Sequence, residues 1–555
     1  MNRVRDIVIF VLIVAGLAFL FTRDKGNSVP FRKSSVKQAE KLSGLQFEST
    51  ERKLMMEDLS GNLENYESIR NLKIPNSVQP SIQFNPVPIG AQFDKIRRQI
   101  RWSPAGEVSR PDNLEELAFS SVGQLAELIR TRQVNSTELT KMYLSRLKEH
   151  GPTLECVVTL TENLALKQAA RADREIVSGN YRGPLHGIPY GIKDLFSVED
   201  YITTWGAVPY KDQMIDENAT VVNRLEEAGA VLVAKLTLGA LAWGDVWFGG
   251  KTKNPWNLEE GSSGSSAGSG SATAAGLVAF AIGTETWGSI VSPSTRCGVT
   301  GLRPTFGRVS RTGAMALSWS MDKNGPMCRT VEDCAMVFNA NYGPDGQDQS
   351  VADIPFNYRP RVDFSNLRVG YFKLAFDEDY PTKENDAKVL DVLKELGADL
   401  IPFDLPDFPV EDLSFILSAE AAAAFDELTL SGEDDLMVRQ ERRAWPNVFR
   451  ASRFIPAVEY IQANRARHML QQEMAEKMKK VDLYVTPSFG GNNSLLTNLT
   501  GHPCVVVPNG FKENGSPTSI SFIGQLYDEG TILAVAKAYQ DATDWHKQHP
   551  SMFIP

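Results

Sequence analysis

The segment that most constrains this chain spans residues 261–289, GSSGSSAGSGSATAAGLVAFAIGTETWGS. Ten of its first eleven residues are glycine or serine, which is the composition of a flexible linker. An apolar run at residues 277–282 follows almost at once and is typical of a buried α/β core. Small residues also let backbones pack closely, and serines beside a helix N-terminus gather N–H donors and hydroxyls in a confined space. Composition alone therefore leaves two interpretations open, a linker or a functional site.

The composition of the whole chain excludes several classes of protein. The 555 residues are 42% hydrophobic and 23% charged, which is globular composition with ample material for a large core. The formal net charge is -10 and no Lys/Arg-rich cluster with interleaved aromatic residues occurs, so we expect no nucleic-acid partner. The five cysteines never follow a C-x-x-C spacing, and His546 and His549 have no evident third ligand. We therefore expect neither a disulfide framework nor a bound metal.

The N-terminus carries an unbroken apolar run at residues 7–21, flanked by basic residues on both sides. A membrane-spanning helix needs about 20 apolar residues, so the run is short for a span. A cleaved signal segment would leave Phe19 at or near the start of the mature chain, which favours an uncleaved anchor over residues 1–22. We therefore predict a membrane-anchored protein, with export after cleavage as the alternative.

The remaining chain divides by composition into an extension and a folded body. Residues 23–110 are polar and punctuated by proline, and we predict that they pack on or link to the body, with one helix near residues 50–72. Residues 111–555 alternate strand and helix patterns without a long linker or an internal repeat. Strands are predicted at residues 155–160, 229–236, 482–486 and 504–508, and helices at 135–147, 220–228 and 531–548. This alternation predicts one large α/β domain.

Lys193 is a lone lysine in the apolar, glycine-framed segment 187–196, GIPYGIKDLF. Burial would disfavour the ammonium form and lower its pKa, which would make a neutral amine available as a base. The alternative is a structural lysine whose amine reaches the surface or pairs with Asp194. Since lysines in apolar runs are more often structural than catalytic, this segment alone does not decide between the two.

Five separated segments supply the missing context. They are, in order, residues 183–194 (GPLHGIPYGIKD), 254–257 (NPWN), the Gly/Ser run, 283–290 (GTETWGSI) and 298–305 (GVTGLRPT). Their order and spacing resemble the amidase signature family, and the resemblance covers most of residues 115–550. It implies the fold of that family, a single large domain whose central mixed β-sheet is covered by helices.

The resemblance also implies the roles of individual residues. Ser289 aligns with the nucleophile, and Lys193 aligns with the base. Ser265, 24 residues before Ser289, aligns with a bridging serine that follows a cis peptide bond. A serine hydroxyl is a poor nucleophile until a base takes its proton, and this chemistry requires no metal or organic cofactor. Backbone N–H groups would bind the oxyanion, and they align with Thr286, Trp287 and Gly288.

Three residues depart from the family pattern. Trp287 replaces the usual glycine, Glu285 the usual aspartate and Val291 the usual arginine. A tryptophan still donates its backbone N–H but lacks the backbone freedom of glycine. None of these changes removes the triad, but all three alter the expected shape of the substrate site.

Three functions fit these residues. The first is a membrane-anchored serine amidohydrolase that forms an acyl-enzyme and releases an acid and ammonia or an amine. The anchor and the apolar residues 240–243 and 247–248 make a lipophilic or aryl amide its candidate small-molecule substrate. The second is the amidase component of a tRNA-dependent amidotransferase, which the anchor, the extension and the lack of basic patches argue against. The third is a non-catalytic, membrane-tethered binding protein, for which Trp287 is the motive. The sequence does not indicate an oligomeric state.

Overall fold

The structure is a computed structural model that describes residues 30–555. The described chain divides into two compact units between Ile74 and Pro75. Within residues 30–74, the first unit contains two helices, α2 (Lys33–Ser43) and α3 (Ser49–Arg70), and α3 matches the helix predicted near residues 50–72. An ion pair between Glu40 and Arg52, with Oε1 and Nε 2.6 Å apart, joins the two helices.

The predicted membrane anchor, residues 7–21, lies outside the described residues. Across residues 30–555, no helix is long and apolar enough to cross a membrane. The helices α3 and α16 (Ala457–Met478) have 22 residues each but carry charged side chains along their length. A spanning helix needs about 20 predominantly apolar residues. This finding contradicts the predicted membrane-anchored or exported location.

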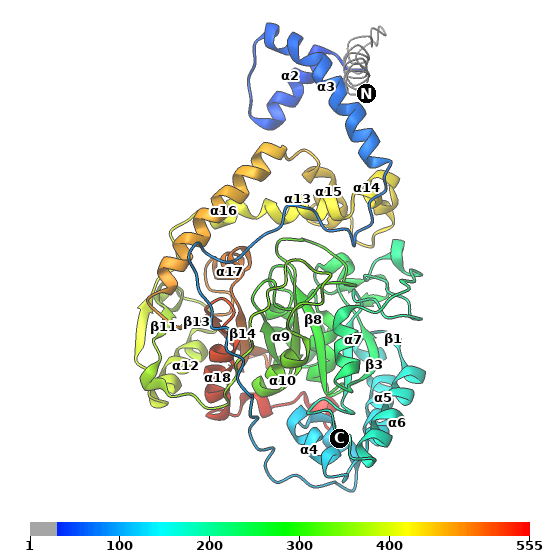
Figure 1. Ribbon diagram of the computed structural model, residues 1–555, viewed down its shortest axis with the longest axis vertical. Helices are drawn as coiled ribbons and strands as arrows, with labels where there is room; N and C mark the ends of the chain where they lie inside the picture. The colour runs from blue at the N-terminus through cyan, green and yellow to red at the C-terminus, as the bar shows by residue number, and fades with distance from the viewer. Residues whose placement is uncertain (1–29) are drawn as a thin grey trace, which may run out of the picture. The chain divides into compact units, whose positions relative to one another are not determined.

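The second unit, Pro75–Pro555, is built around one sheet of 11 strands in the order β1-β3-β2-β8-β10-β9-β14-β15-β13-β11-β12 (Figure 1). The sheet is mixed, because β2 pairs in parallel with β3 and β8, and β11 pairs in parallel with β12 and β13. The other neighbouring strands are antiparallel. The strands are β1 (Val157–Leu160), β2 (Pro189–Lys193), β3 (Val231–Leu236), β8 (Phe280–Glu285), β9 (Thr300–Arg303), β10 (Lys323–Cys328), β11 (Val369–Phe372), β12 (Leu400–Phe403), β13 (Leu483–Pro487), β14 (Cys504–Phe511) and β15 (Pro517–Gly524).

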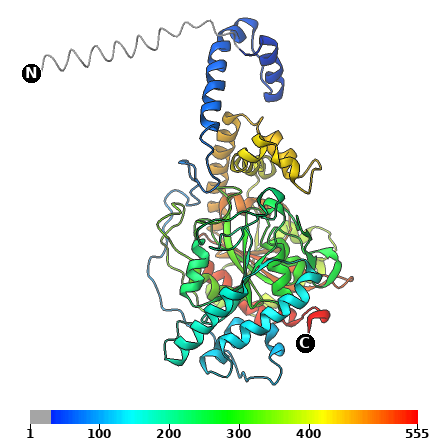
Figure 2. The same ribbon diagram turned by 90° about the vertical axis from the view of Figure 1, so that its right-hand side faces the viewer.

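Helices cover this sheet, as the resemblance implied. Figure 1 shows α5 and α6 beside β1 and β3 at one end of the sheet and α12 beside β11 at the other. The C-terminus lies against α5, where Arg146 Nη2 donates to Phe553 O at 2.6 Å (Figure 2). The helices are α4 (Val122–Arg130), α5 (Ser136–Leu154), α6 (Glu162–Val177), α7 (Thr220–Glu227), α8 (Ala267–Ala274), α9 (Val291–Cys297), α10 (Val331–Asn341), α11 (Lys373–Asp377), α12 (Lys383–Glu395), α13 (Phe415–Ala424), α14 (Asp426–Ser431), α15 (Trp445–Ser452), α16, α17 (Asn493–Thr500) and α18 (Glu529–Asp541).

The local sequence explains the elements that lead to the site. β3 has the sequence VLVAKL and all six of its residues are buried, which is the pattern of a strand covered on both faces. α5 begins with a capping box in which Asn135 Oδ1 accepts the Glu138 N–H and the Glu138 carboxylate accepts the Asn135 N–H. Two short hairpins, β4 (Val246–Trp247) with β5 (Gly250–Lys251) and β6 (Lys253–Asn254) with β7 (Asn257–Gly261), lie outside the large sheet. The chain passes from the second hairpin directly into the Gly/Ser run.

Candidate active site

Lys193 is the last residue of β2, and its side chain is fully buried. Its Nζ is hydrogen-bonded to Ser265 Oγ at 2.8 Å, Ser266 Oγ at 3.1 Å and Thr284 Oγ1 at 2.8 Å. Burial lowers the pKa of Lys193 well below its ordinary value, against the opposing fields of Asp322 and Glu285. A neutral amine can donate its two N–H groups to Thr284 and Ser266, which leaves its lone pair for the Ser265 proton.

The predicted structural alternative for Lys193, pairing with Asp194, does not occur. The Asp194 carboxylate instead pairs with Lys235 of β3, with Oδ1 and Nζ 2.9 Å apart and both side chains fully buried. Asp194 Oδ2 also accepts the Thr204 N–H at 2.9 Å. The adjacent residues Lys193 and Asp194 therefore have different partners. Asp194 pairs with Lys235, and the Lys193 amine is hydrogen-bonded to Ser265 and Ser266.

The Gly/Ser run is a closely packed part of the core. All residues of α8 are buried, and a Cβ at Gly268 would lie 2.5 Å from Thr237 N. Before α8, the peptide bond between Gly264 and Ser265 is cis, as the resemblance implied. A Cβ at Gly264 would lie 1.9 Å from Gly244 O, so this position has room only for glycine. The small residues thus permit close backbone contact, and the linker interpretation is wrong.

Ser266 attaches this loop to β8. Its Oγ accepts the Thr284 N–H at 3.1 Å and donates to Thr284 O at 3.0 Å. Its backbone N–H donates to Ser289 O at 3.2 Å. A backbone hydrogen bond therefore connects the loop that carries Ser265 to the turn that carries Ser289. Through Ser266, the loop also contacts Thr284, to which the Lys193 amine is hydrogen-bonded.

Ser289 lies in the turn between β8 and α9, and it is 7% exposed. Within residues 30–555, its hydroxyl has no hydrogen-bond partner. Gly288 is the one residue of this turn with a positive φ, at 80°. Trp287 does not have a positive φ, so its position does not require the backbone conformations that glycine alone adopts easily. Its side chain is 42% exposed.

Glu285 holds the two ends of this turn together. Its Oε2 accepts the N–H groups of Ile290 at 2.8 Å and Val291 at 3.0 Å, and its Oε1 accepts from Arg303 at 2.9 Å and Asn498 at 2.9 Å. Burial would raise the pKa of Glu285, but Arg303 and the Val291 N–H outweigh it and hold the pKa at about 2. The buried carboxylate is therefore ionised and fixes the start of α9 against the end of β8.

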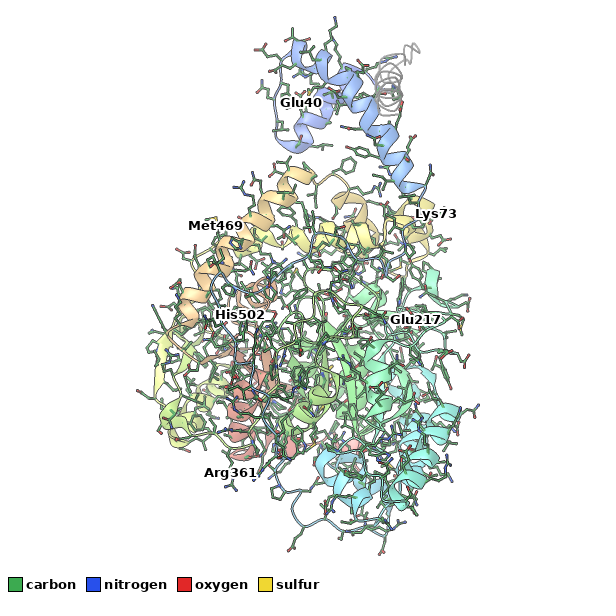
Figure 3. All side chains as sticks on the ribbon, in the orientation of Figure 1. Glu40, Lys73, Glu217, Arg361, Met469 and His502 are labelled. Carbon is green, nitrogen blue, oxygen red and sulfur yellow. The ribbon has the colours of Figure 1, made fainter. Side chains whose placement is uncertain are left out.

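A cavity of about 430 Å³ opens beside these residues and is lined by Thr284 and Thr286 of the site. Thr286 Oγ1 donates to Asp322 Oδ1 at 2.6 Å, which orients the first residue of the turn. Burial raises the pKa of Asp322, although Thr286 and two backbone N–H groups donate to it. Glu217, labelled in Figure 3, is an exposed carboxylate on the lining. Eight further lining residues come from residues 311–319.

Comparison with known proteins places this geometry in a family. The profile of the family described as Amidase matches residues 138–494, which is more than half of the chain. The chain belongs to the amidase family. Members of this family are hydrolases that act on C–N bonds.

Individual relatives of this amidase agree with that assignment. The chain is 32% identical over 481 residues to a subunit of the glutamyl-tRNA(Gln) amidotransferase of Marinomonas sp. (strain MWYL1), covering 78% of this chain and 98% of the relative. The native peptide amidase of Stenotrophomonas maltophilia is 28% identical with a TM-score of 0.69, covering 77% of this chain and 97% of that one. An amidase family protein of Bacillus anthracis is 27% identical with a TM-score of 0.69, covering 78% and 92%. The predicted amidase signature fold is thereby confirmed.

The residues that support this candidate site were not predicted from the sequence. Asn498 and Asp322 lie far along the chain from the motifs they contact, and no local pattern marks them. Arg303 does stand in the segment GVTGLRPT, so its position in a family motif was a usable signal. Thr284 and Ser266 lie within the matched motifs without an expected role, but both contact the Lys193 amine.

Proposed function

We propose that this amidase hydrolyses a linear carboxylic amide through an acyl-enzyme formed on Ser289. The observation that supports this most is the buried hydrogen bond between Lys193 Nζ and Ser265 Oγ, at 2.8 Å. Activation of a serine hydroxyl requires a base and a path for the proton. Lys193, whose pKa is lowered, would be the base, Ser265 would relay the proton, and Ser289 in the adjoining turn would be the nucleophile.

The proposed reaction begins with proton transfer. Ser289 gives its hydroxyl proton to Ser265 as Ser265 gives its own to the Lys193 amine, and Ser289 Oγ bonds to the amide carbon. The carbonyl oxygen becomes an oxyanion, which accepts hydrogen bonds from backbone N–H groups of the turn. One such donor is worth about 3–4 kcal/mol of the barrier. These donors are proposed to be the N–H groups of Thr286, Trp287 and Gly288.

Collapse of the tetrahedral intermediate breaks the C–N bond. The proton on Lys193 returns through Ser265 to the leaving nitrogen, which departs as ammonia or an amine. A water then attacks the Ser289 ester and gives a proton to Lys193 through Ser265. Collapse of this second tetrahedral intermediate breaks the bond between the acyl carbon and Ser289 Oγ, the proton returns from Lys193 through Ser265 to Ser289 Oγ, and the acid leaves. Lys193 and Ser265 end in their initial protonation states, so the cycle closes with no net proton gained or lost by the enzyme.

The size of the cavity favours a compact substrate. Its volume of about 430 Å³ lies near the lower end of the range for small-molecule sites. The apolar residues that suggested a lipophilic amide give it little support, because Trp243 packs against Trp445, with ring centroids 4.7 Å apart. Ala242 does line the cavity. We therefore infer that the enzyme prefers a short acyl amide or an aryl amide to a long-chain acyl amide as its substrate.

A second candidate is an amidase component that supplies ammonia to a partner enzyme. It is favoured by the 32% identity to the glutamyl-tRNA(Gln) amidotransferase relative over 98% of that relative's length. Under this hypothesis the amide is glutamine, and the purified chain should hydrolyse it faster when a partner protein is present. Equal turnover with and without any co-purifying protein would count against it.

One experiment separates the candidates. Wild type and Ser289→Ala are treated with a fluorophosphonate probe, and wild type is then assayed on short aryl amides, amino-acid amides, glutamine and long-chain acyl amides. We expect labelling of wild type alone and fastest turnover of the short amides. Labelling retained in Ser289→Ala refutes the nucleophile, and a folded wild type that neither labels nor turns over supports the non-catalytic binding protein.

A further inference from the structure

One wall of the cavity beside the candidate site is built by residues that precede the family match. Asn76, Ser77 and Gln79 line the cavity together with Thr284 and Thr286. The amidase match begins at residue 138, so these three residues belong to a part of the chain that the family profile does not cover. The site of this chain therefore has a lining that the matched region alone does not supply.

Asn76 is bound through both polar ends of its side-chain amide. Its Nδ2 donates to Ala316 O at 2.8 Å and to Ala424 O at 3.3 Å, and its Oδ1 accepts the Ala316 N–H at 2.8 Å. Ala316 itself lines the cavity, and Ala424 is the last residue of α13. One side chain thus satisfies the N–H and the C=O of Ala316, which fixes this segment at the rim of the cavity.

The same segment is held again beyond the cavity. Phe84 packs edge-on against Phe306 with ring centroids 5.1 Å apart, and the Arg467 guanidinium lies over the Phe84 ring. Gln471 Nε2 donates to Asn85 O at 2.8 Å. Residues 75–86, called the strap below, form no helix or strand, so side-chain contacts determine their path. Figure 1 shows this part of the chain in blue, crossing the body from near α13 past α17.

Gln79 lies between the two sets of anchors. It is half-buried on the cavity, and its side chain has no hydrogen-bond partner within residues 30–555. Its amide can therefore donate to or accept from a ligand in the cavity. A substrate that extends from Thr286 to the outer side of the cavity would meet the strap at this residue.

We propose that the strap determines the size of amide that this site accepts, by closing the outer side of the cavity at residues 76–79. The proposal rests on the proposed function, since it concerns access to the same nucleophile. Releasing Asn76 frees the strap from Ala316 and enlarges the cavity. A larger side chain at Gln79 reduces the cavity without touching the anchors.

The test compares the full-length wild type with Asn76→Ala, Gln79→Trp and a matched control, Gln92→Ala. Gln92 is exposed and does not line the cavity. The readout is kcat/KM for a bulky N-aryl acyl amide divided by kcat/KM for a short primary amide. We expect this ratio to rise about tenfold in Asn76→Ala and to fall about tenfold in Gln79→Trp, which is the scale on which pocket shape discriminates substrates. Gln92→Ala should leave the ratio unchanged.

A second measurement does not require turnover. Hydrogen exchange of the Ala316 amide, which donates to Asn76 Oδ1, should accelerate in Asn76→Ala and not in Gln92→Ala. Ratios that stay within twofold of wild type in both cavity variants, or unchanged exchange at Ala316, overturn the proposal. If wild type hydrolyses no amide while exchange at Ala316 accelerates as expected, the proposed function fails and the anchoring of the strap stands.

Discussion

Glu285→Gln tests whether the buried carboxylate holds the turn that carries Ser289. The fold lowers the pKa of Glu285 from an ordinary value near 4.3 to about 2. About two pKa units at 1.36 kcal/mol each correspond to roughly 3 kcal/mol of stabilisation of the ionised form. Loss of one partner of a buried ion pair costs about 3–5 kcal/mol, because it leaves the Arg303 charge uncompensated. The two figures agree, so we expect about 3 kcal/mol of lost stability at pH 7.

The sign of the pH dependence follows from the depressed pKa. The stabilisation by ionised Glu285 is fully present above the pKa of the unfolded carboxyl and is lost as the pH falls toward about 2. The difference in unfolding free energy between wild type and Glu285→Gln should therefore shrink as the pH is lowered from 7 toward 3. The control Glu285→Asp keeps the charge and shortens the side chain by one methylene, which should cost about 1 kcal/mol.

The assay is urea unfolding of the three proteins at several pH values, with hydrogen exchange of the Ile290 and Val291 amides as a local measure. These amides donate to Glu285, so their exchange should accelerate in Glu285→Gln and change little in Glu285→Asp. A loss below about 1 kcal/mol at pH 7, or a difference that does not depend on pH, would refute the reasoning.

Three further outcomes follow from the site. Lys193→Ala should lower kcat by at least about a hundredfold while the far-ultraviolet circular dichroism stays native, and turnover within tenfold of wild type would show that Lys193 is not the base. The pH profile of kcat/KM should rise on one ascending limb and level off well below pH 10.4, the ordinary lysine pKa, since burial lowers the pKa of Lys193; a limb centred on the ordinary value would contradict a buried base. Gly264→Ala should lower soluble yield and probe labelling together, because its Cβ would lie 1.9 Å from Gly244 O. Wild-type labelling in that variant would mean that the loop can shift without loss.

The sequence predicted the parts of this protein that local patterns encode. The strand predicted at residues 229–236 is β3, the one at 482–486 is β13, and the helix at 220–228 is α7, because continuous apolar runs and 3.6-residue periodicity are local signals. The pairing of Lys193 with Ser265 follows from no such signal. It came from the resemblance, which carries the spatial arrangement of distant motifs.

The interactions that the sequence did not reveal join segments that are far apart in the chain and that only the fold brings together. Asp194 pairs with Lys235 because β2 and β3 are neighbours in the sheet, and nothing near Asp194 marks that partner. Asn498 of α17 reaches Glu285 at the end of β8 across 213 positions of the chain, and no local pattern marks that contact. The anchoring of Asn76 on Ala316 spans 240 positions, and a polar, proline-containing segment gives no indication of its path. Such contacts require the fold before they can be predicted.

The most direct test of the central claim is to trap the acyl group. Wild type and Ser289→Ala are mixed with a good amide substrate, quenched in acid within one turnover, digested and examined by mass spectrometry. We predict an acyl adduct on the peptide that contains Ser289 in wild type, mapped to that residue, and no adduct in Ser289→Ala. An adduct on Ser265, or steady hydrolysis of the amide without any adduct on Ser289, would contradict the account.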